Sequence, residues 1–179
     1  MITLQLAQHR KARIWLTELP DARVNPSDVS ERSVQGVKPV TDGTHRAAIE
    51  ILIPRGPRAL YGLLGAELRP SKSGALVIRV VKSCTDGPPF PNSIALSSDD
   101  TRIGLPDEFS QAVVEGASNQ IAKIGGLGSG ELVFDHAAHG LVGSAPIVFK
   151  WLAICLVQFF REGESISQQQ IANILQSAL

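Results

Sequence analysis

Alternating apolar and polar residues predict β-strands in the first half of the chain. Between residues 46 and 53 every second residue is apolar, as in a half-buried strand: Ala47, Ile49, Ile51 and Ile53. Residues 75–82 are rich in Val, Leu and Ile on both faces, which indicates a more central strand. A half-buried edge strand is predicted at 12–18, and residues 59–68 fit either a helical turn or a strand. Residues 19–44 show no sustained period and predict an excursion over the surface.

Helical periodicity dominates the second half. Pro106 suits a first helical position, and an apolar stripe follows it at spacings of three and four: Phe109, Ala112, Val113, Gly116, Ala117 and Ile121. Residues 131–135 alternate and predict a returning strand. Residues 147–160 are apolar almost all round, so we expect a deeply buried helix with Ser144 as its cap.

A last helix is predicted after residue 167. Ser167 and Gln170 have the spacing of a capping box, and Ile166 and Ile171 that of a hydrophobic staple. We expect this helix to cover the apolar helix before it. Because there are too few crossover helices to cover two faces of a sheet, the pattern predicts an α+β fold, a two-layer α/β sandwich with a mixed sheet and helices on one face. The 179 residues are expected to form one domain.

Charge and cysteine usage narrow the functional classes. Lys and Arg number 17 and Asp and Glu number 17, so the chain has no overall positive field, and nucleic acid could be held only by a local patch; no DNA partner is expected. Cys84 and Cys155 lack C-x-x-C spacing and indicate reduced, packed thiols. The N-terminus lacks the pattern of a signal peptide, and the longest apolar run, 145–160, is too short to span a bilayer. We therefore expect a cytoplasmic protein without membrane contact.

Two stretches carry a resemblance to a known family. Residues 104–109 (Gly-Leu-Pro-Asp-Glu-Phe), followed by 112–116 (Ala-Val-Val-Glu-Gly), resemble the start of a helix in domain IV of translation elongation factor G. In that family a strand runs into a histidine-bearing tip loop and then into a long apolar helix. Residues 132–134, 139–144 and 147–150 are similar in content and order. The likeness covers about half the chain, as a domain IV-like core over 74–160 between N-terminal strands and a long loop (1–73) and a C-terminal helix (161–179).

The resemblance implies a two-layer sandwich with a βαβ unit, and an exposed tip formed by His139, Gly140, Leu141, Val142 and Gly143. It also implies a ribosome or another RNA–protein assembly as partner. Two departures are evident: the acidic residues that follow the family's histidine are replaced by Gly, Leu and Val, and no phosphate-binding G-x-x-x-x-G-K-[ST] loop of a GTPase is present. The leading hypothesis is therefore a free-standing, non-catalytic binding domain.

A glycine-rich segment, 125–130, supports an alternative. Gly126, Gly128, Ser129 and Gly130 could cradle a phosphate, and they resemble the Gly-Leu-Gly-Ser element of GHMP kinases. That element leads into a helix, whereas here a strand is predicted to follow. A helix-to-strand connection is favoured, and a nucleotide-binding protein remains the alternative.

Other candidate groups favour structural roles. His136 and His139, beside Asp135, lack a third metal ligand of suitable spacing, so no metal or cofactor is expected. No serine or cysteine has the setting of an activated nucleophile, and we predict no catalytic residue. Two clusters of basic residues could form solvated strand edges or a phosphate-binding patch, and we favour solvated edges. The clusters are His9, Arg10, Lys11 and Arg13, and Arg55 with Arg58 around Gly56–Pro57. Self-association through the C-terminal helices is a third hypothesis.

Overall fold

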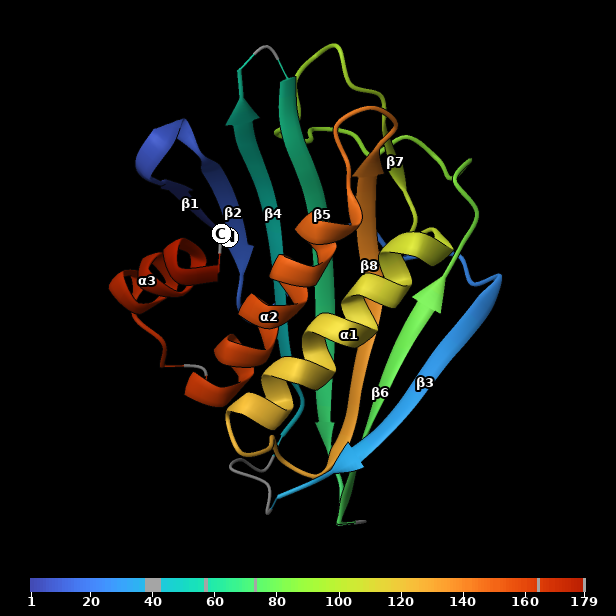
Figure 1. Cartoon of the computed structure of the whole chain (residues 1–179), viewed down its shortest axis with the longest axis vertical. Coiled ribbons are helices and arrows are strands. Elements are labelled where there is room, and N and C mark those ends of the chain that lie inside the picture. The colour runs from blue at the N-terminus through green and yellow to red at the C-terminus, as the bar shows by residue number, and fades with distance from the viewer. Residues whose placement is uncertain (38–42, 57, 73, 164, 179) are drawn as a thin grey trace.

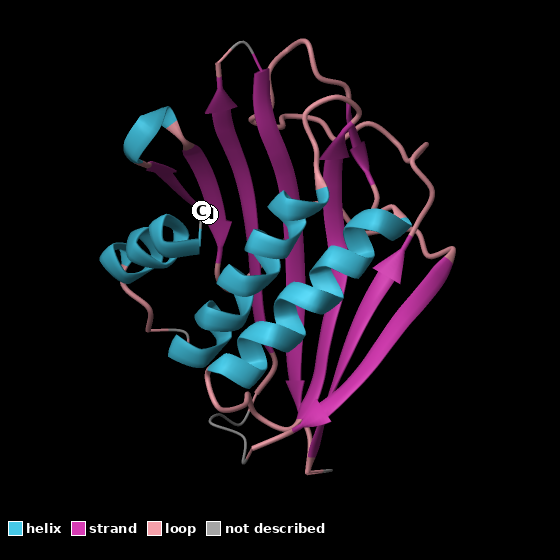
Figure 2. Ribbon diagram, in the orientation of Figure 1, coloured by secondary structure: helices cyan, strands magenta, loops and turns pink. Residues whose placement is uncertain are grey.

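The computed structural model describes residues 1–37, 43–56, 58–72, 74–163 and 165–178. It has an α+β fold in which a mixed sheet of eight strands lies under a layer of three helices, so the predicted fold class is confirmed (Figures 1 and 2). The strands are β1 (Ile2–Gln5), β2 (Lys11–Trp15), β3 (Asp28–Gln35), β4 (His45–Arg55), β5 (Arg58–Pro70), β6 (Ala75–Lys82), β7 (Thr101–Ile103) and β8 (Gly130–Gly140). The helices are α1 (Asp107–Lys123), α2 (Pro146–Glu162) and α3 (Gln168–Ala178), and a short 3₁₀ turn spans Ala7–His9.

The strand order across the sheet is β1-β2-β4-β5-β8-β6-β3, with β7 pairing to the upper part of β8. Among the paired strands that the structure describes, only β6 and β8 are parallel neighbours, and the segment between them contains β7 and α1. In Figure 1 this helix passes in front of the sheet while the chain moves leftward from β6 to β8. The crossover is therefore left-handed, the opposite of nearly all such units.

The main core lies between the sheet and α1 and α2. The predicted stripe of β4, Ala47, Ile49, Ile51 and Ile53, is buried there, and so is the predicted stripe of α1. The rings of Phe109 and Phe149 stack with centroids 4.6 Å apart, which joins the two helices. Gly116 permits their close approach, since a Cβ at this position would stand 2.6 Å from the carbonyl oxygen of Lys150. Both helices consequently lie side by side on one face of the sheet.

The opposite face of the sheet is partly covered by loops. A smaller apolar cluster lies there, formed by Trp15, Ala22, Ala48, Leu63 and Ala138 with Leu19 and Phe90 packed against it. The connections after β2 and after β6 supply Ala22, Leu19 and Phe90. The strands of the centre are thus buried on both sides, although helices cover only one.

Two predictions about the N-terminal half are corrected, and one open alternative is resolved. The predicted surface excursion contains β3, which pairs with β6 along its whole length. Its residues are mostly exposed because it is an edge strand, so no apolar alternation was present to mark it. The strand β2 is not an edge, since β1 pairs with its outer side. The ambiguous residues 59–68 belong to β5, and residues 38–42 and 57 lie outside the described residues.

The predicted helix starts need smaller corrections. Pro106 is the N-cap of α1 and not its first residue, and α2 is capped at Ala145 without a side-chain bond from Ser144. The capping box of α3 is confirmed, because the backbone N–H of Ser167 donates to Gln170 at 2.9 Å and that of Gln170 donates to Ser167 at 3.3 Å. Helix α3 packs against α2, as predicted. None of the described helices is long and apolar enough to cross a bilayer.

Candidate binding surface at one end of the sheet

Exposed apolar side chains gather at the end of the sheet where β8 turns into α2. Among the described residues seven large apolar side chains are exposed, and three of them, Leu96, Leu141 and Val142, lie in this region. Val142 is 72% exposed and Leu141 54%. Leu96 and Val142 belong to different loops, yet they line one small hollow of about 70 Å³. The fold therefore brings two distant segments together in an apolar patch.

The turn that carries Leu141 and Val142 is held by a carboxylate. Asp99 accepts hydrogen bonds from the backbone N–H groups of Val142 and Gly143, each 3.0 Å long. Added Cβ atoms at Gly140 and Gly143 would stand 2.1 and 2.4 Å from Asp99 Oδ2, so this approach needs glycine at both positions. The exposed turn is thus fixed in one conformation before any partner arrives.

The same turn is tied to strand β5 through a single residue. The backbone N–H of Tyr61 donates to Gly143 O at 2.9 Å, and Ser144 Oγ donates to Tyr61 O at 2.7 Å. Ser144 Oγ also accepts a bond of 2.9 Å from the N–H of Gly140. Ser144 therefore closes the turn and does not cap the helix.

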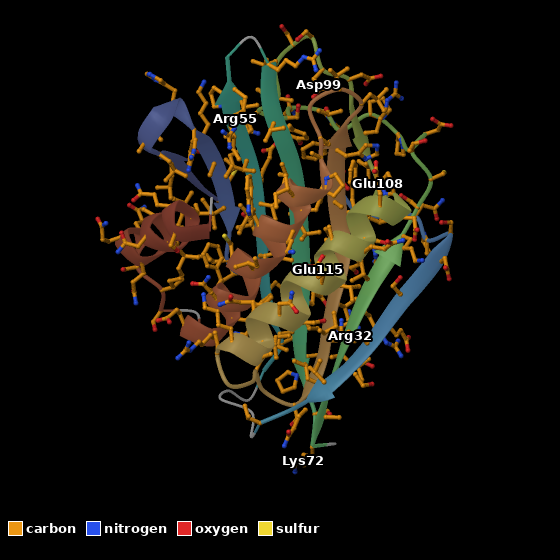
Figure 3. The ribbon with its side chains drawn as sticks, viewed as in Figure 1. Arg32, Arg55, Lys72, Asp99, Glu108 and Glu115 are labelled. Atoms are coloured by element: carbon orange, nitrogen blue, oxygen red, sulfur yellow. The ribbon has the colours of Figure 1, made fainter. Side chains whose placement is uncertain are left out.

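Two arginines flank the apolar patch. Arg55 and Arg58 end the β4–β5 hairpin, both are exposed, and neither forms an ion pair with another described residue. Arg58 lines the same hollow as Val142. Figure 3 shows Arg55 and Asp99 at the same end of the molecule. We call Arg55, Arg58, Leu96, Leu141 and Val142 the tip surface.

His139 does not belong to the tip surface. The family resemblance predicts this residue in an exposed loop, but strand β8 extends to Gly140 and His139 is only 2% exposed. Its Nδ1 lies 3.2 Å from Gly104 O, and its ring packs edge-on against Phe109 with centroids 5.8 Å apart. Burial lowers the pKa of His139. The exposed-tip prediction is therefore wrong for His139, Gly140 and Gly143, which are buried, whereas Leu141 and Val142 are exposed.

A buried carboxylate on the opposite face of the sheet positions the loop that carries Leu96 and Asp99. Glu50 is 0% exposed and accepts bonds from the Tyr61 hydroxyl at 3.0 Å and the Ile94 N–H at 2.9 Å. Arg13 lies 3.4 Å from the other Glu50 oxygen and donates to Asn92 O at 2.5 Å. Burial raises the pKa of Glu50, and the Ile94 N–H, the Tyr61 hydroxyl and Arg13 act in the opposite direction.

The sequence did not predict this hydrogen-bond network around Glu50. The one sign of the network in the sequence was Glu50 itself, a single acidic residue between Ile49 and Ile51 in the clearest predicted strand. A charge on a strand covered on both faces needs partners, but the chain order does not say which. The structure also shows that Arg13, predicted in a solvated basic cluster, is bound within the network.

The glycine-rich segment is a connection between α1 and β8, as favoured from the sequence. Some of its backbone N–H groups donate within the chain: that of Gly126 to Ile121 O at 2.9 Å and that of Ser129 to Val37 O at 2.8 Å. Gly128 and Gly130 are buried, and Ser129 Oγ donates to Ser71 O at 2.6 Å. These bonds tie the segment to its own chain, which agrees with its role as a connection.

The structure separates the two histidines. His136 Nδ1 lies 2.7 Å from Asp135 Oδ1, beside a register shift between β5 and β8, while His139 packs toward α1. No group of three His, Cys, Asp or Glu residues able to hold a metal occurs among the described residues. Cys84 is exposed, contrary to the prediction of a packed thiol, whereas Cys155 is buried and its pKa is raised to about 12.

No protein-family model matches the chain, and no curated protein matches it.

Proposed function

We propose that this chain is a non-catalytic binding domain whose tip surface contacts a ribosome or another RNA–protein assembly in the cytoplasm. The observation that carries the proposal is a rigid apolar turn, Leu141 and Val142, beside Arg55 and Arg58, which are exposed and form no ion pair with another described residue. Arginine recognises phosphate through its planar fork, and exposed apolar side chains find partners on protein components. An RNA–protein assembly offers both phosphate groups for the arginines and protein surface for the apolar side chains.

Preorganisation supports a binding role for this end of the molecule. Because Asp99 and Tyr61 already hold the turn, a partner would not have to order it, and this ordering is a major cost of association. The elements β6, α1, β8, the exposed turn and α2 also follow in the order on which the resemblance to elongation factor G domain IV rests. That order agrees with a tip-mediated contact, although His139 plays no part in it.

Co-sedimentation with ribosomes tests the proposal. The wild-type chain should pellet with ribosomes at moderate salt, and the double variant Arg55→Glu, Arg58→Glu should remain in the supernatant. Loss of the two phosphate contacts should also flatten the salt dependence of any residual binding. Lys72→Glu is the matched control, because Lys72 is an exposed cation at the opposite end of the molecule (Figure 3).

The apolar part of the tip surface is tested separately with Val142→Asp, which should weaken co-sedimentation while leaving the melting temperature unchanged. A wild-type chain that stays wholly unbound would contradict the proposal. Equal loss of binding in Lys72→Glu and in the double arginine variant would also contradict it, since that result means attraction by general charge and not by the tip surface.

A further inference from the structure

Helix α2 carries a second apolar stripe on the side that faces away from the sheet. Ile147, Trp151 and Ile154 follow one another at spacings of four and three, so they share one face of the helix. Ile147 is 43% exposed, and Trp151 and Ile154 are half-buried. In a two-layer fold this outer side of the helix layer contacts water (Figure 1). Apolar residues there have no covering layer among the described residues.

Basic side chains accompany the stripe. Lys150 and Arg161 lie on the same side of α2, and Lys123 comes from the last turn of α1. These cations and the three apolar residues line one shallow groove of about 470 Å³, to which Ile124 also contributes. No acidic side chain is among its described lining residues. Lys150 does pair with Glu115 on α1, which leaves Lys123 and Arg161 as the exposed charges.

We propose that this groove binds an amphipathic helix of a partner protein, with an apolar stripe flanked by Asp or Glu. The apolar positions would lie against Ile147, Trp151 and Ile154, as in helix-in-groove recognition. Acidic positions would face Lys123 and Arg161, and this complementarity would set orientation and association rate. From Ile147 to Arg161 the face of α2 is about 21 Å long, enough for about four turns of partner helix.

Two other occupants fit the groove less well. A second copy of this chain would place Arg161 and Lys150 against the same cations in a symmetric dimer, and like charges across an interface are costly. Single-stranded nucleic acid would meet the cations, but it needs aromatic platforms for its bases and finds Trp151 alone between two isoleucines. The aliphatic floor favours an apolar helix.

The test uses Trp151 as a reporter in the full-length variant Trp15→Phe. Trp15 is buried in the small cluster on the other face of the sheet, so its replacement leaves one tryptophan at the groove. The probe is a synthetic 15-residue helix with Leu at helical spacing and Glu at flanking positions. Its matched control carries Lys in place of each Glu.

The acidic peptide should shift Trp151 emission to shorter wavelength with saturation, and its affinity should fall roughly ten-fold between low and moderate salt. The lysine peptide should bind at least ten-fold more weakly. Arg161→Glu, an exposed substitution, should lower the affinity of the acidic peptide and raise that of the lysine peptide. Ile154→Glu should abolish both, while Lys72→Glu should change neither.

Several results would overturn the proposal. These are no emission shift with either peptide, equal binding of both, or an unstructured 15-nucleotide RNA that binds Trp151 in place of the acidic peptide. A concentration-dependent dimer by light scattering that Arg161→Glu or Ile154→Glu dissociates would assign the groove to a second copy instead. Because no tip residue takes part, failure here is distinct from failure of ribosome binding.

Discussion

The hydroxyl of Tyr61 donates a hydrogen bond of 3.0 Å to Glu50, a carboxylate with no exposed surface. The backbone of the same tyrosine accepts from Ser144 and donates to Gly143 in the turn between β8 and α2. Tyr61 thus connects the loop held by Glu50 with the turn held by Asp99. Two of the three segments that form the tip surface, the loop with Leu96 and the turn with Leu141 and Val142, are therefore linked through this one residue of β5.

We predict that Tyr61→Phe destabilises the chain by about 1–3 kcal/mol, since it removes one of the donors to a buried carboxylate. Urea unfolding at pH 7 measures the change. The control is the same Tyr61→Phe substitution made in a Glu50→Gln background. Phe109→Tyr would not serve as a control, because it alters the main core. In that background the loss should shrink, because the acceptor is no longer a charge. Equal losses in both backgrounds would show that the Tyr61 hydroxyl does not act through Glu50.

A second prediction concerns the carboxylate that holds the exposed turn. Asp99→Asn places an amide NH₂ near one of two backbone N–H groups, those of Val142 and Gly143, so one of the two hydrogen bonds is lost. Hydrogen exchange at both amides should accelerate, and ribosome co-sedimentation should weaken while the fold persists. Asp100→Asn is the control, because the Asp100 side chain pairs with Arg102 and not with the turn. Unchanged exchange at Val142 would contradict the assigned role of Asp99.

The local periodicity of apolar residues was sufficient to predict a strand or helix and its buried face where burial follows a regular pattern. The stripes of β4 and α1 could be read from the sequence because each buried face repeats at the period of its own element. The limits of β6 were predicted to the residue. Edge strand β3 could not be recognised, because its place in the sheet comes from backbone pairing to β6 while its side chains remain mostly exposed. This pairing depends on β6, a segment distant in the sequence, so the local pattern of β3 does not indicate it.

The candidate site shows the same division. Leu141 and Val142 were named from the sequence, but their anchor, Asp99, is 43 positions from Val142 and lies in a loop without periodicity. His139 was misplaced because the predicted strand ended at residue 135, whereas the structure shows a register shift beside His136 and continues β8 to Gly140. A register shift interrupts the alternation on which the prediction depended. The residues of the site were therefore partly foreseeable, but their supports were not.

The glycine segment provides a third prediction, on stability. Gly130 has a φ of +148°, and a Cβ there would stand 2.0 Å from Arg69 O. Gly130→Ala should therefore cost at least about 2 kcal/mol, since rigid backbone of β5 must move. Gly43→Ala is the matched control, because nothing lies within 4 Å of its added methyl group. Thermal unfolding of both variants measures the difference, and two similar midpoints would contradict the structural role of Gly130.

The last prediction is a loss of stability below about pH 6.5 that originates at His139. Burial lowers the pKa of His139 from its ordinary value of 6.5, while Gly104 O, Thr85 O, Asp99 and Glu108 act in the opposite direction with smaller effect. Below pH 6.5 the imidazole of His139 therefore binds a proton in the unfolded chain but not in the folded chain. The free energy of unfolding falls as pH falls, until the pKa of His139 in the folded chain is reached.

The measurement is urea unfolding between pH 5 and 7 for the wild type and His139→Gln, which removes the titrating group and keeps a donor for Gly104 O. The variant should be less stable at pH 7 but show a flatter pH dependence. Other groups also contribute to the pH dependence of stability. Asp28, Glu67 and Asp107 have lowered pKa values and shift stability at more acidic pH, and Glu50 has a raised pKa and acts with the opposite sign. These contributions are common to both proteins, so they cancel in the difference between the two curves. Parallel curves for wild type and variant would mean that His139 titrates equally in the folded and unfolded chains.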